Sequence, residues 1–65
     1  MNCEIDDELT KLLIKNKYKN KEIWFITNEM LEKYYAIVTW IKGIPHSEGH
    51  YTYEQVKEKI TLKLI

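Results

Sequence analysis

The sequence predicts a small α+β domain that runs in the order helix, β-hairpin, loop and helix. Apolar residues recur at helical spacing near both ends, a β-branched and aromatic segment lies between them, and a stretch containing proline and glycine follows that segment. The 65 residues have room for one domain, residues 1–65, with one core. A three-helix bundle is the alternative, because residues 28–42 fit a helix as well as a strand.

The first segment predicts a helix over residues 6–16. Its apolar residues share one helical stripe and are Ile5, Leu9, Leu12 and Leu13. Asp6 is the expected N-cap, and acidic residues precede lysines in the way that complements a helix dipole.

The middle of the chain predicts the hairpin. Residues 22–27 form a short β-branched and aromatic run, and residues 33–42 return against it across a loop at 28–32. Residues 28–42 also contain apolar positions at helical spacing, which leaves the choice between helix and strand open there. An unpaired strand leaves backbone groups without partners, and this cost favours the hairpin.

The last third predicts a loop and then a helix. Residues 44–51 have loop composition, with Pro45, Ser47, Gly49 and two histidines. Thr52 is the expected cap of a closing helix, and Gln55 stands at the capping-box position.

Charge and cysteine usage predict a cytoplasmic protein. The net charge is zero, but four acidic residues fall within 1–10 and five lysines within 11–21. The start is acidic and no apolar run reaches membrane-spanning length. Cys3 is the only cysteine, which excludes a disulfide within the chain and suggests a reducing compartment. Arginine is absent while lysine, asparagine and isoleucine are frequent, a bias typical of an AT-rich bacterial or phage genome.

No pattern indicates an enzyme, a cofactor or a metal centre. Ser47 adjoins His46, but neighbours in sequence rarely have the geometry of a catalytic triad. The chain has no glycine-rich phosphate loop. His46, Glu48 and His50 lie close in sequence, yet a zinc site needs three or four fixed ligands; whether they ever bind a metal stays open.

The aromatic content indicates a binding protein. Eight of the 65 residues are aromatic, and aromatic side chains are enriched at protein interfaces and their hot spots. We expect a small protein-binding regulator or inhibitor of phage or mobile-element type, directed at a host protein such as a nucleic-acid-handling enzyme. The candidate contact residues are Trp24, Tyr34, Tyr35, Trp40, Tyr51 and Tyr53.

A DNA-binding module is the alternative function, and a structural homodimer is a third. Basic residues lie near Tyr18 and Trp24, which suits stacking on bases; they are Lys15, Lys17, Lys19 and Lys21. Residues 25–35 and 38–45, with Tyr53 and Val56, resemble the winged-helix pattern of excisionase and MerR-type DNA binders. The resemblance implies a recognition helix, although the stretch between Tyr35 and Val38 is short for the turn that such a motif needs.

Overall fold

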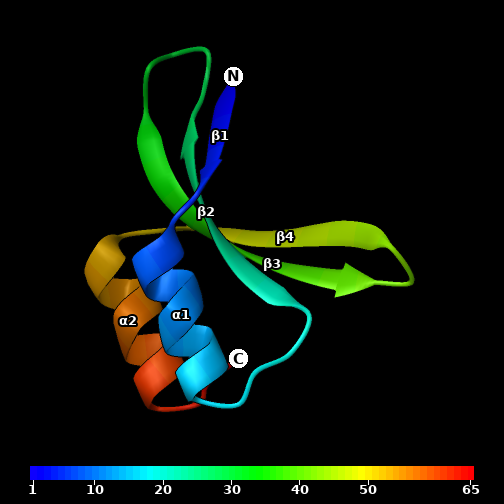
Figure 1. Cartoon of the computed structure of the whole chain (residues 1–65). Coiled ribbons are helices and arrows are strands. Elements are labelled where there is room, and N and C mark those ends of the chain that lie inside the picture. Colours follow the sequence, from blue (N-terminus) through cyan, green and yellow to red (C-terminus); the bar gives the residue numbers. More distant parts are fainter.

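A computed structural model describes residues 1–65 as a four-stranded antiparallel sheet with two helices on one of its faces (Figure 1). The elements in chain order are β1 (Asn2–Ile5), α1 (Asp7–Lys15), β2 (Lys21–Thr27), β3 (Lys33–Ile41), β4 (Ile44–Tyr51) and α2 (Tyr53–Thr61). The strands lie in the order β1-β2-β3-β4, so β1 and β4 form the two edges. The helices run side by side in the same direction (Figure 1).

Both helices begin at capping residues that the sequence indicates. The Asp6 carboxylate accepts a hydrogen bond from the Leu9 backbone N–H at 2.9 Å. Thr52 and Gln55 form a reciprocal capping box at the start of α2. Neither helix, at nine residues each, has the length and apolar character of a membrane-spanning segment.

The turn between β3 and β4 closes a long hairpin. Lys42 and Gly43 have φ of 52° and 79°, and Ile41 and Ile44 pair directly across them. Two consecutive residues at positive φ make the kind of turn that matches the twist of a hairpin. The tip of this hairpin extends beyond the helices (Figure 1), so its Ile41 and Ile44 are exposed.

The core lies between the helices and one face of the sheet. It consists of Leu9, Leu13, Ile23, Ile37, Val56 and Ile60. Ile23 and Ile37 pair across β2 and β3 and therefore point to the same face. The Thr10 hydroxyl accepts a hydrogen bond from the Ile23 backbone N–H at 3.1 Å and ties α1 to β2.

The opposite face of the sheet carries no helix, yet part of it is buried. Ala36 and Val38 alternate with Ile37 and therefore point away from the helices, but only 1% and 0% of their surface is exposed. Trp24 is the cross-strand neighbour of Ala36, and Trp40 follows Val38 on the same face. The two indoles therefore share the helix-free face with Ile26 and Tyr34, and these large side chains surround Ala36 and Val38.

The domain is α+β, but the expected layout of helix, hairpin, loop and helix is wrong because it lacks two strands. Residues 44–51, expected as a loop, form β4 along β3, and residues 2–5 form β1 along β2. The three-helix bundle is also wrong. Residues 21–27 and 33–41 are strands, as the hairpin interpretation had it.

The winged-helix resemblance does not extend to the structure. Residues 25–35 and 38–45, which carry the resemblance, form parts of the strands β2, β3 and β4 and the turns between them instead of two helices. Residues 33–41 form a strand and not a helix because both faces of β3 carry buried apolar residues and because β2 and β4 pair with it on either side.

Candidate protein-binding site

Four of the five tyrosines line one surface depression, which we call the tyrosine groove. Its volume is about 440 Å³, and its lining residues are Glu32, Lys33, Tyr34, Tyr35, His50, Tyr51, Thr52 and Tyr53. The residues come from the start of β3, the end of β4 and the start of α2. The groove therefore lies where the chain leaves the sheet to enter α2.

The groove exists because β4 pairs with β3 only as far as Tyr35 and leaves the first two residues of β3 without a partner on that side. Tyr35 pairs with Tyr51, whereas Lys33 and Tyr34 pair with β2 and have no partner in β4. After Tyr51 the chain turns away into α2. The first part of β3 consequently has a free edge, which is the kind of edge that can accept another strand.

An irregularity in β4 places Tyr51 in the groove. From Tyr35 to Ile37 β3 advances by two residues, while the partners move from Tyr51 to Glu48, so β4 holds one extra residue. Gly49, within this bulge, has φ of 81°, and a Cβ there would lie 2.3 Å from the Tyr51 ring. The ring thus lies directly against the glycine backbone, and its hydroxyl donates a hydrogen bond to Glu48 at 2.8 Å.

Tyr53 joins the groove to the start of α1. Its hydroxyl donates a hydrogen bond to the Glu8 carboxylate at 2.9 Å, a contact between residues 45 positions apart. Its ring meets the edge of Tyr35 at 6.0 Å between centroids, and Tyr35 contacts Phe25 at 4.9 Å. These edge and tilted contacts are favourable between aromatic rings and hold one wall of the groove in place.

Tyr34 lies at the other wall. Its ring packs against the His50 imidazole, with 3.8 Å between centroids. Tyr34 belongs to the helix-free face and Tyr35 to the helix-covered face, because successive residues of a strand alternate. The groove therefore wraps around the edge of the sheet.

The pKa of three groove phenols, Tyr35, Tyr51 and Tyr53, is raised above the ordinary value of 10.0. For Tyr51 the largest cause is its hydrogen bond to Glu48, and for Tyr53 it is its hydrogen bond to Glu8. For Tyr35 burial raises the pKa most, and nearby carboxylates including Glu8 add to it. The hydroxyls of Tyr51 and Tyr53 are therefore held in their neutral, hydrogen-bonded form by the carboxylates of Glu48 and Glu8.

Two of the candidate contact residues lie outside the groove. Trp24 is half-buried on the helix-free face, and its indole N–H is buried without a hydrogen-bond partner. Trp40 lies on the same face, and its indole N–H donates to Glu22. The structure thus brings together Tyr34, Tyr35, Tyr51 and Tyr53 and separates them from the two tryptophans.

The lysines proposed for nucleic acid are spread over three elements. Lys15 ends α1, Lys17 and Lys19 lie in the following loop, and Lys21 begins β2. The Lys21 ammonium donates a hydrogen bond to the Thr39 hydroxyl at 2.7 Å. The nearby aromatic Tyr18 is half-buried and packs against the core.

No group of three or more potential metal ligands occurs in the structure. His46, Glu48 and His50 lie along β4; Glu48 is bonded to Tyr51, and His50 packs on Tyr34.

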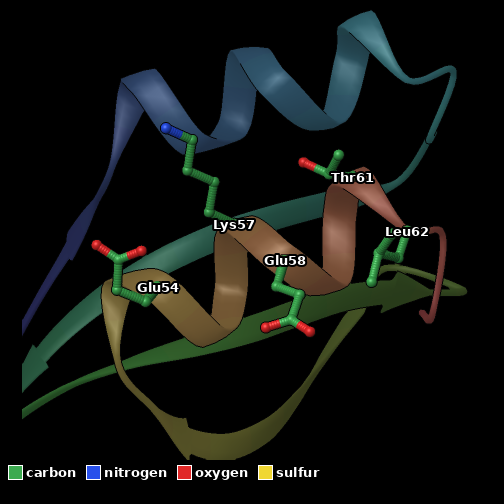
Figure 2. Close-up of a pocket in the computed structure, with 5 residues that line it drawn as sticks. All are labelled: Glu54, Lys57, Glu58, Thr61 and Leu62. Atoms are coloured by element: carbon green, nitrogen blue, oxygen red, sulfur yellow. The ribbon is translucent and has the colours of Figure 1, made fainter.

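A second depression, of about 370 Å³, lies along α2 (Figure 2). Its lining residues are Glu54, Lys57, Glu58, Thr61 and Leu62. All five come from one helix and its C-terminal turn, and Leu62 is the only apolar residue among them. A ligand site usually needs an apolar wall with converging polar groups, so the tyrosine groove is the better candidate.

Sequence reasoning missed the acidic partners and the glycine of the groove. Glu8 appears as a first-turn residue of α1, and only the tertiary contact with Tyr53 reveals its second role. Gly49 carried a sequence signal for the bulge, because glycine inside a strand often marks a bulge or a close approach.

No protein-family model, curated protein or solved structure matches this chain.

Proposed function

We propose that this protein is a small, non-enzymatic, protein-binding regulator, and that the tyrosine groove is its contact surface. One observation carries the proposal: four half-buried tyrosines surround one open depression beside a free stretch of strand edge. Tyrosine combines a large apolar area with a hydroxyl that can hydrogen-bond, which is why it is enriched at protein interfaces.

Rigid support for the tyrosines strengthens the proposal. Tyr51 is fixed by Gly49 and Glu48, and Tyr53 by Glu8. A contact surface that is ordered before binding loses less side-chain freedom when the partner arrives. We also propose that the protein acts in a reducing compartment, the cytoplasm, because Cys3 is exposed and unpaired.

Affinity capture with matched variants tests this function. The immobilised wild-type protein and the double variant Tyr34→Ala/Tyr51→Ala are incubated with a bacterial lysate, and the retained proteins are identified and quantified. Trp40→Ala is the control, because it removes an exposed aromatic residue outside the groove. Circular dichroism checks that each variant is folded.

We expect the wild type and Trp40→Ala to retain the same protein in similar amounts. The groove variant should retain at least about tenfold less of it, because loss of an aromatic interface residue can cost about 1.4 kcal/mol of binding free energy or more. Equal retention by the groove variant would reject the groove as the contact surface. Recovery of nucleic acid alone, with binding that collapses between low and physiological salt, would favour the DNA-binding alternative. A discrete dimer in sedimentation at micromolar concentration, without any retained protein, would favour the homodimer.

A further inference from the structure

We infer that the tyrosine groove binds an extended peptide segment that carries arginine or lysine side chains. This inference rests on the proposed function and specifies the chemistry of the partner. Its basis is the combination of aromatic ring faces, surrounding carboxylates and a free strand edge at one place in the fold.

The first observation is that two groove rings already attract ammonium groups of this chain. The Lys59 ammonium lies over the Tyr51 ring at 5.1 Å from its centroid. The Lys57 ammonium lies over the Tyr53 ring at 5.9 Å. Both distances fall within the range of cation–π attraction, so the faces of these rings suit a positive charge. Lys57 is exposed and Lys59 half-buried, and both reach the rings on flexible side chains, which a partner's cation can displace.

The second observation is the set of carboxylates around the groove. Glu8 and Glu48 accept hydrogen bonds from the phenols, and Glu32 lines the groove itself. Asp6 and Glu54 add their charge near Tyr53. Lys33 is the one lysine in the lining, and it is adjacent to Glu32. With the two α2 lysines displaced, the groove presents mostly negative charge, which is complementary to a basic segment.

The third observation explains why the segment is extended. Lys33 and Tyr34 lack a partner strand on the side of β4. Backbone groups alternate along an antiparallel ladder, so those of Tyr34 face Ile26 of β2, whereas the N–H and C=O of Lys33 are directed outward beside the groove. An extended peptide can hydrogen-bond to such an edge while alternate side chains reach the rings. A folded domain with a convex surface makes no use of this edge.

A peptide titration tests the inference. The probe is a short peptide of alternating threonine and arginine with both ends blocked, and the same peptide with glutamate in place of arginine is the control. Amide NMR spectra of the labelled protein report where each peptide binds. We expect the arginine peptide to shift the amides of residues 33–35 and 50–53, and the glutamate peptide to leave them unchanged. Equal binding of both peptides, or shifts confined to other residues, would overturn the inference.

Charge variants separate local contact from a general charge effect. Glu48→Gln should weaken the arginine peptide about threefold, in line with a partly exposed ion pair, while Glu58→Gln on the outer side of α2 should not. Lys59→Met should strengthen binding about threefold because it removes the competing cation from the Tyr51 ring. Lys63→Met makes the same charge change in the turn after α2 and should leave affinity unchanged. Equal effects of Lys59→Met and Lys63→Met would contradict a cation site at the ring.

The two proposals fail in different ways. If the lysate experiment yields a groove-dependent partner but the arginine peptide does not bind, the function stands and the cationic partner is wrong. If groove variants retain every captured protein and the peptide still binds the groove, the cation site stands and the proposed function is wrong.

Discussion

The side chains of the two tryptophans and of the groove tyrosines lie in different surroundings. Trp24 and Trp40 lie on the helix-free face beside Ala36 and Val38, which are buried although no helix covers them. The groove tyrosines instead line an open depression, and the hydroxyls of Tyr51 and Tyr53 donate hydrogen bonds to Glu48 and Glu8. Tyr35, Tyr51 and Tyr53 also pack against the core beneath the helices, so their rings contribute to the core and line the groove at the same time.

The largest expected effect is the loss of stability when Trp24 is truncated. Trp24→Ala should lower the free energy of unfolding by about 3 kcal/mol, because the indole covers apolar residues that no helix protects. Urea denaturation measures this change. Tyr34→Ala, on the same face at the groove, is the matched variant and should cost clearly less. A Trp24→Ala variant as stable as the wild type would return Trp24 to the candidate contact residues.

Two glycines give the next comparison. Gly49→Ala and Gly43→Ala should each cost about 1–2 kcal/mol, because both residues have positive φ. Only Gly49→Ala places a Cβ against the Tyr51 ring; Gly43 has open space around it. We expect Gly49→Ala alone to displace that ring, which NMR of the aromatic protons detects. Unchanged Tyr51 signals in Gly49→Ala would contradict the close approach described for the groove.

Ionisation of three tyrosines should lower the stability of the fold in alkaline solution. The pKa of Tyr35, Tyr51 and Tyr53 is raised above 10.0 in the folded chain. The stability that this shift contributes is fully present below pH 10 and is lost as the pH rises through the raised pKa values. NMR titration of the phenol rings should show these three tyrosines ionising above the ordinary pKa. Ionisation of Tyr51 or Tyr53 at or below pH 10 would contradict the hydrogen bonds to Glu48 and Glu8.

The smallest effect is expected at the hairpin tip. Ile41 and Ile44 are 49% and 59% exposed and pair across the turn, outside both the helix contacts and the groove. The double variant Ile41→Thr/Ile44→Thr should change the free energy of unfolding by no more than about 0.5 kcal/mol, because threonine also suits an exposed strand. Thermal unfolding followed by circular dichroism checks this. A larger loss would show that the tip packs against another part of the molecule.

Local patterns predicted the elements whose signals are local. The caps Asp6 and Thr52 mark the two helices, and the aromatic, β-branched residues around 22–27 and 33–41 mark β2 and β3. The strand β1 was missed because its four exposed residues carry no pattern, and pairing with the distant Trp24 and Phe25 defines it. The strand β1 is therefore stabilised by its pairing with β2 and not by a local sequence preference.

The strand β4 was missed for a different reason. Pro45, Ser47 and Gly49 give it loop composition, but an edge strand tolerates proline and a bulge tolerates glycine. A usable signal was present in the Lys42-Gly43 turn between Ile41 and Ile44. Since the groove forms where β4 departs from β3, missing β4 also hid the arrangement of the tyrosines.

Site-specific photo-cross-linking tests whether the tyrosine groove is the contact surface of the protein. A photoreactive phenylalanine analogue is placed at Lys33, an exposed residue in the groove lining, and separately at Ile44 on the hairpin tip. Both proteins are irradiated in the same bacterial lysate. We expect a covalent adduct with one protein from position 33 and none from position 44. An adduct from position 44 without one from position 33 would contradict the assignment of the tyrosine groove as the contact surface.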